Sequence, residues 1–333
     1  MTRLRVIGGL HASGYRRHTL HADERLWVEK NCYVDVIIEM LHALGHEPLA
    51  AMGFCAAIDF EGDNFTFFKP QHEELRELFG VDLQELNVWR PLLDHATEHL
   101  GAGKLISTEA DSFWLPDTAG TDYRRNHVKT TIIIAELDST AGVLGYFHNA
   151  SYHELHGEDF DRLFRRGEPP DPTFLPLFAE LVRIDRMLHR SPSELAVLAA
   201  GRLAVHLERQ PAANPIARFG ERFARDLPSL QAAGLAHYHA WAFSTTRQLG
   251  AASELLSLHV GWMAEHGALP SEVAATAADQ LMRLSEMAKA FILKGARAVS
   301  ARKPLDASAS FEEMAQLWSD ALQGLGRAVR VPT

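Results

Sequence analysis

Three residues of this chain have the types and the order that covalent catalysis by a thiol requires. Cys32 lies early in a stretch with helical periodicity, His127 opens a stretch rich in β-branched residues, and Asn149 ends the next strand-like stretch. A cysteine nucleophile needs a base that holds its proton and a third polar group that orients this base. Neighbouring antiparallel strands can bring His127 and Asn149 together, so the pattern predicts a catalytic triad.

The cysteine belongs to the element around which the chain is organised, a predicted amphipathic helix over residues 31–45. Asn31 is its expected N-cap and Gly45 its expected C-cap. The unpaired backbone N–H groups of a first helical turn favour a thiolate over a thiol. Cys32 is therefore placed as a nucleophile, and a buried, inert cysteine is the alternative. Cys55 has apolar neighbours and is predicted to be an inert core residue.

Composition restricts the class of protein. The 333 residues carry a formal net charge of −10, which argues against a general nucleic-acid binder because binding phosphates requires a positive field. No apolar run reaches membrane-spanning length, and two cysteines are too few for a disulfide framework. We therefore expect a cytoplasmic protein with no membrane and no nucleic-acid partner. None of the 18 histidines falls in a known zinc spacing, so we expect no bound metal.

One local basic patch surrounds His127 and consists of Arg124, Arg125 and Lys129. Such a patch could meet an acidic partner or a phosphate, and solvated surface charges are the alternative. Asp111, at the end of an expected strand, could bind an amine, with an edge charge as its alternative.

The elements that must position these residues form an α+β pattern followed by helices. We expect short helices over 49–58, 73–79 and 86–100, and strands over 65–68, 104–111, 127–135 and 142–149. A helix followed by antiparallel strands predicts an α+β domain. Prolines at positions 169, 170 and 172 predict a linker. Residues from about 174 onward show helical periodicity with several breaks, which predicts five to seven helices. The expected domains are residues 1–168 and 169–333.

Residues 24–165 resemble the papain-like fold as used by bacteriocin-processing cysteine peptidases and butirosin-type acyltransferases. The resemblance is carried by Asn31-Cys32 opening a long helix, by His127 beginning an apolar strand, and by Asn149 before Gly157-Glu158-Asp159-Phe160. The second half also looks like the helical domain of the butirosin-type family. The whole chain is similar to a bacterial family of unassigned function that is often encoded beside amino acid:carrier-protein ligases.

The resemblance implies an acyl or aminoacyl transferase. Its donor would be the phosphopantetheine thioester of a carrier protein, its intermediate acyl-Cys32, and its acceptor a small-molecule amine. Phosphopantetheine would be carried by the partner, so the chain itself needs no bound cofactor, and an amino acid:carrier-protein ligase becomes a candidate partner.

One departure from the papain pattern affects the choice of reaction. Position 26 is Leu26, where papain-like peptidases carry an oxyanion-hole glutamine, so Asn31 is the candidate oxyanion or supporting residue. This favours acyl transfer over peptide hydrolysis. A cysteine peptidase or amidase of the same fold and a non-catalytic carrier-binding scaffold are the competing hypotheses.

Overall fold

The computed structural model describes residues 3–169, 171 and 173–329. It divides into two compact units, of which the first comprises Met1–Pro48 and His72–His189 and the second Leu49–Gln71 and Arg190–Thr333. The predicted boundary at residue 168 lies too early, because residues 179–183 form a strand that pairs inside the first unit.

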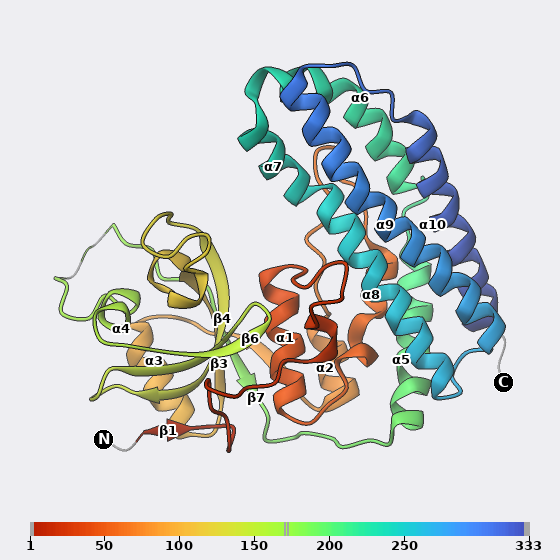
Figure 1. The fold of residues 1–333 in the computed structure, drawn as a ribbon. Helices are drawn as coiled ribbons and strands as arrows, with labels where there is room; N and C mark the ends of the chain where they lie inside the picture. The colour runs from red at the N-terminus through yellow and green to blue at the C-terminus, as the bar shows by residue number, and fades with distance from the viewer. Residues whose placement is uncertain (1–2, 170, 172, 330–333) are drawn as a thin grey trace. The chain divides into compact units, whose positions relative to one another are not determined.

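The first unit is built on an antiparallel sheet, which confirms the α+β class. Among the described residues the sheet has seven strands in the order β2-β7-β3-β4-β5-β6, with β1 paired to β4 (Figure 1). The strands are β1 (Leu4–Arg5), β2 (Asp82–Glu85), β3 (Leu105–Asp111), β4 (Lys129–Asp138), β5 (Val143–His148), β6 (Ser151–His156) and β7 (Ala179–Arg183).

Helices cover the sheet on two sides. Helix α1 (Cys32–Ala43) contacts β4, β5 and β6. On the opposite face, α3 and α4 cover a core that includes Ile132, Ile134 and Tyr146. The remaining elements of this unit are η1 (Thr19–His21), α2 (His72–Phe79), α3 (Leu92–Gly101), η3 (Ser112–Trp114), η4 (Pro116–Thr118) and α4 (Glu158–Leu163).

Helix α1 confirms its sequence signals. Asn31 Oδ1 accepts a hydrogen bond from Val34 N at 2.9 Å, as an N-cap does. Leu44 is the C-cap, and Gly45 follows it with a φ of 79°, a conformation that favours glycine at this position. Its middle turns are buried throughout, so α1 is a core helix rather than a surface helix.

The predicted strands over 104–111, 127–135 and 142–149 are present as β3, β4 and β5. The predicted strand over 65–68 is wrong, because Phe65 makes only an isolated bridge with Phe60 and its ring packs on Phe219. The predicted helix over 86–100 begins only at Leu92, after Pro91. Strands β1, β2, β6 and β7 were not predicted from the sequence.

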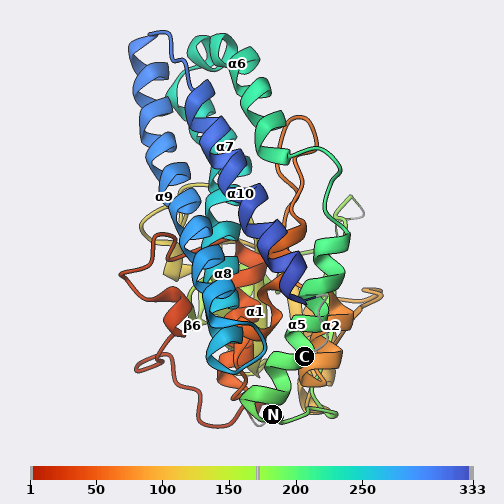
Figure 2. The same ribbon diagram turned by 90° about the vertical axis from the view of Figure 1, so that its right-hand side faces the viewer.

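The second unit is helical, and its six α-helices within the described residues agree with the expected five to seven. Figures 1 and 2 show the long helices α8, α9 and α10 side by side. Segment 49–71 joins this unit because His259 Nδ1 contacts Leu49 O at 2.6 Å and Arg218 Nη1 donates to Phe60 O at 2.8 Å. The elements are η2 (Pro48–Ala57), α5 (Pro192–Glu208), α6 (Pro215–Ala233), α7 (Leu235–Ser244), α8 (Thr246–Glu265), α9 (Ser271–Ala301) and α10 (Ser308–Val329).

Candidate active site at the start of helix α1

Cys32 is the first residue of α1, and its thiol is half-buried. The Sγ atom donates a weak hydrogen bond to Thr131 Oγ1 on β4 at 3.7 Å. The thiol therefore lies at the positive end of the helix dipole and above the sheet, where it remains partly open to solvent. Cys55, in contrast, is fully buried in the second unit, and burial raises the pKa of its thiol well above the ordinary value.

The structure does not bring His127 to Cys32. His127 lies four residues before Thr131, an interval that an extended chain covers in about 13 Å. Its Nδ1 contacts Asp111 Oδ2 at 2.6 Å, and its ring stacks on Phe113 with centroids 4.3 Å apart. The imidazole side chain is 68% exposed. In this arrangement His127 is a surface residue oriented by a carboxylate and cannot take the Cys32 proton directly.

Asn149 does not orient His127 either. It is one of the two residues that connect β5 to β6, between the paired residues His148 and Ser151, and its φ is 47°. Asparagine tolerates this left-handed conformation better than most residues, so the position is explained by the turn. Asp111, which sequence reasoning assigned to substrate binding, instead contacts His127 as the predicted asparagine would.

The predicted basic patch is largely paired with acids. Arg124 contacts Asp159 at 2.7 Å and Glu158 at 3.2 Å, and Lys129 contacts Glu109 at 3.0 Å. Arg125 is exposed. The local positive field at this patch is therefore weaker than its sequence implied.

A polar cluster that sequence reasoning missed lies beside the cysteine turn. Glu180 on β7 is 1% exposed and accepts hydrogen bonds from Tyr33 OH at 3.0 Å and from Ser107 Oγ at 3.0 Å. His72 Nε2 lies 3.1 Å from Glu180 Oε1 and 2.9 Å from Tyr33 OH. The His72 side chain is 33% exposed, so this imidazole joins a buried carboxylate to the solvent.

Hydrogen bonding decides the charge of Glu180. Burial alone would raise the pKa of this carboxyl, but the hydrogen bonds from His72, Tyr33 and Ser107 outweigh burial and hold the pKa below its ordinary value. Burial and the nearby Glu180 charge raise the pKa of Tyr33, so its hydroxyl stays a donor. The cluster therefore holds an ionised carboxylate that orients His72.

The cluster and the thiol share one face of the sheet. Ser107 pairs with both Ile133 and Glu180, and directly paired residues point to the same side. Thr131, two positions before Ile133, therefore points to that side as well. Cys32 and Tyr33 are consecutive in α1, so the start of the helix places the thiol at Thr131 of β4 and the imidazole–carboxylate pair at Glu180 of β7 on the same face of the sheet.

Compared with known protein families, residues 16–184 match the DUF1839 N-terminal domain and residues 192–327 match the DUF1839 C-terminal domain. The chain belongs to the DUF1839 family. No curated protein matches it. The two family domains meet between residues 184 and 192, which agrees with β7 lying in the first unit of this DUF1839 chain.

A second carboxylate–imidazole pair of the DUF1839 chain lies on the opposite sheet face. His148 contacts Asp117 Oδ2 through Nδ1 at 2.5 Å and Thr130 Oγ1 through Nε2 at 2.8 Å, and it is 1% exposed. Tyr146 also donates to Asp117, at 2.5 Å. Burial raises the pKa of Asp117, but the His148 hydrogen bond outweighs this and lowers it. This buried pair fastens η4 to the sheet.

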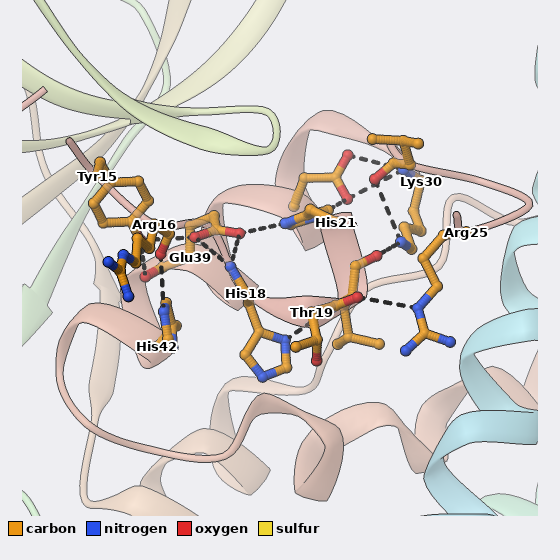
Figure 3. Close-up of polar contacts among 12 residues, drawn as sticks. Tyr15, Arg16, His18, Thr19, His21, Arg25, Lys30, Glu39 and His42 are labelled. Atoms are coloured by element: carbon orange, nitrogen blue, oxygen red, sulfur yellow. Dashed lines mark hydrogen bonds and ion pairs between the residues drawn. The ribbon is translucent and has the colours of Figure 1, made fainter. Parts of the chain in front are cut away.

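A third polar cluster anchors the segment before α1. Asp35 and Glu39 of α1 are fully buried, and each contacts one ring nitrogen of His21. Figure 3 shows the contact between His21 and Glu39. His21 Nε2 contacts Asp35 Oδ1 at 3.0 Å, and His21 Nδ1 contacts Glu39 Oε1. Tyr15 OH donates to Glu39 at 2.7 Å. This cluster holds the chain that leads to Cys32.

In the described part of the chain, no group of three or more His, Cys, Asp or Glu side chains is arranged to hold a metal ion, and no helix is long and apolar enough to cross a bilayer. A cavity of about 390 Å³ lies on the α3 and α4 side of the sheet, opposite Cys32, and is lined by residues that include Trp89, Leu92, Phe164 and Phe174.

Proposed function

We propose that this DUF1839 chain is a cysteine-dependent acyltransferase. It would move an acyl or aminoacyl group from a carrier-protein phosphopantetheine thioester, through acyl-Cys32, to an amine acceptor. The observation that carries the proposal is the half-buried Cys32 thiol on the first turn of α1. A helix N-terminus favours the thiolate, and the thiolate is the nucleophilic form.

The reaction has two steps that balance in atoms and charge. The Cys32 thiolate attacks the thioester carbonyl carbon, the bond from this carbon to the pantetheine sulfur breaks, and the carrier leaves as a thiol after gaining one proton. The acceptor amine then attacks acyl-Cys32 and loses one proton, and the Cys32 thiolate is released. The first-turn N–H groups of α1 are suited to stabilise the oxyanion of both steps, and the Asn31 cap holds this turn in shape.

We assign the proton transfers to His72 in place of His127. His72 contacts the hydroxyl of Tyr33, the residue next to Cys32, and is oriented by Glu180. Its Nδ1 has no hydrogen-bond partner among the described residues, which leaves that nitrogen to exchange protons. His127 lies four residues before Thr131 in the chain, and its Nδ1 contacts Asp111.

The proposal includes a papain-like arrangement of the first unit. A cysteine opens a helix that packs across an antiparallel sheet, which supports this assignment. The carrier protein and the amine acceptor are suggested by the resemblance of the sequence rather than by the geometry of the site. Arg125 is an exposed cation of the basic patch, and we assign it to docking of an acidic carrier.

The test is intact mass spectrometry after incubation with a chemically acylated carrier protein. We expect an acyl adduct on the wild type and on Cys55→Ala, the matched control, and none on Cys32→Ala. Added amine should release an amide. An adduct that persists in Cys32→Ala, or no adduct with any carrier, would overturn the proposal, whereas release of free acid alone would identify a hydrolase.

The same experiment separates the two imidazoles. His72→Gln should slow adduct formation by about 10²-fold or more, the usual contribution of a general base. His127→Gln should stay near the wild-type rate. The reverse result would return the proton-transfer role to His127 and would require the segment before β4 to rearrange.

A further inference from the structure

The contacts of His21 define its protonation state. Its two ring nitrogens each face a carboxylate oxygen, Nε2 on Asp35 at 3.0 Å and Nδ1 on Glu39. A neutral imidazole has one donor nitrogen and one acceptor nitrogen, and an acceptor cannot bond to a carboxylate. With Asp35 and Glu39 ionised, only the imidazolium satisfies both contacts, and His21 is then a buried cation held between two buried anions.

Other groups converge on the same two carboxylates. Glu39 also accepts the backbone N–H of His18 at 3.0 Å and the hydroxyl of Tyr15 (Figure 3). Asp35 also accepts the backbone N–H of Lys30 at 2.9 Å. The Lys30 ammonium, itself fully buried, donates to the carbonyl of Leu20, directly before His21. The two ends of segment 15–30 are thus joined to one pair of carboxylates.

This network ends at Lys30, two residues before the cysteine. Lys30 directly precedes the N-cap Asn31, which in turn precedes Cys32. The carboxylate that holds Lys30 N–H is one of the two that hold His21. Removing the His21 cation would leave Asp35 and Glu39 as buried anions in one site, and breaking a buried ion pair by removing one partner is strongly destabilising. The segment would relieve this cost by separating from α1.

We propose that protonated His21 is a positioning residue that locks the Lys30–Asn31–Cys32 turn to α1, and that the site loses its order when this proton is lost. The proposal rests on the proposed function only for its catalytic consequence. The charged and titratable groups that face the lock are Asp35, Glu39 and His42 from α1, and Tyr15, His18 and Lys30 from the preceding segment.

The direction of the pH dependence follows from His21. Burial lowers its pKa, but the hydrogen bonds that His21 donates to Asp35 and Glu39 outweigh burial, so the pKa lies above the ordinary 6.5. A raised pKa means that the lock is complete below pH 6.5 and is lost as the pH rises through the folded-state value. Burial and the His42 charge lower the pKa of His18 to about 4, so His18 stays neutral across this range.

Hydrogen exchange measured by mass spectrometry tests the lock on the full chain. In His21→Gln we expect amides of residues 15–34 to lose protection by at least about tenfold, because glutamine cannot supply two cationic donors. The matched control is His156→Gln, an exposed histidine at the end of β6, which should leave protection unchanged. Unchanged protection in His21→Gln would overturn the lock.

A pH series on the wild type keeps the test valid if His21→Gln fails to fold. After correction for intrinsic exchange, protection of residues 15–34 should fall as the pH rises above 6.5, while β3 and β4 keep theirs. A flat profile would contradict the proposal.

The acyl-carrier assay separates this inference from the proposed function. His21→Gln should form acyl-Cys32 at least about tenfold more slowly than His156→Gln. If no variant forms an adduct but the exchange results hold, the lock stands and the acyl-transfer proposal falls. If His21→Gln matches the wild type in both assays, the lock falls and acyl transfer is unaffected.

Discussion

At the scale of single residues, the two cysteines differ in burial, and burial limits the reactivity of a thiol. Cys32 is half-buried on a helix N-terminus, whereas Cys55 is 0% exposed. Reaction of a thiol requires both access and the thiolate form. Sequence neighbours alone were enough to separate the two, because Cys55 has only apolar neighbours and Cys32 follows a capping asparagine.

Alkylation measures this difference directly. Iodoacetamide at neutral pH should add one carbamidomethyl group per native chain, at Cys32, and a second at Cys55 only after denaturation. Peptide mapping identifies the site, and Cys32→Ala provides the control, since it should take up no label while folded. Labelling of native Cys55 at a similar rate would contradict its burial.

Glu180 makes a second residue-scale prediction. Its carboxylate receives hydrogen bonds from Tyr33, Ser107 and His72, and Glu180→Ala would remove the buried acceptor that these three donors share. We expect a loss of about 3 kcal/mol in the free energy of unfolding. Glu85→Ala, an exposed glutamate on β2, should change it by less than about 0.5 kcal/mol. Urea denaturation compares the two, and equal effects would refute the role of the cluster.

At the scale of elements, glycines mark where helices pack closely. A Cβ on Gly295 in α9 would collide with the hydroxyl of Tyr238 from α7, which donates to Ile292 O at 2.9 Å. A Cβ on Gly324 in α10 would lie in open space, with no atom of a neighbouring element within 4 Å. The two residues are alike in sequence, and only the neighbouring helix distinguishes them.

Alanine at these glycines should act in opposite directions. Gly295→Ala should lower the free energy of unfolding by about 1–3 kcal/mol, because overpacking exceeds the gain in helix propensity. Gly324→Ala should raise it by about 0.5–1 kcal/mol, because alanine restricts the unfolded chain. Thermal unfolding followed by circular dichroism measures both changes. A stabilised Gly295→Ala would show that α7 and α9 can separate without cost.

At the scale of the whole molecule, the two units differ in how their buried charges are distributed. Glu180 and Asp117 lie in the first unit, and hydrogen bonds hold both carboxyl pKa values below their ordinary 4.5 and 3.8 against the effect of burial. His21 lies in the same unit and has a raised pKa. The first unit is therefore the part of the described chain whose stability should respond to both acid and base.

The acid limb can be predicted with its sign. A depressed carboxyl pKa contributes stability above the unfolded value, and this stability is lost as the pH falls through the folded value. Below about pH 4.5 the strands around Glu180, β3 and β7, should therefore lose exchange protection. Hydrogen exchange between about pH 6 and pH 3 measures this loss, and unchanged protection of β3 and β7 would contradict the prediction. Glu180→Gln should weaken the response.

The elements whose signals are local could be predicted from the amino-acid sequence. The period of residues 31–45, the cap at Asn31 and the β-branched run of β4 were sufficient to place α1 and three central strands. The sequence also placed Cys32 on the first turn of a helix. These features depend on neighbours within a few residues, so side-chain spacing contains the information.

Which side chains contact one another depends on the pairing of strands that are distant in the chain. β7 entered the sheet between β2 and β3, and this pairing brought Glu180 to Tyr33 across 147 positions of the chain. The register of β3 and β4 directed His127 to Asp111, and the hairpin used Asn149 as a turn residue. Order along the chain suggested a triad, but strand order and the face on which each residue points determine contact.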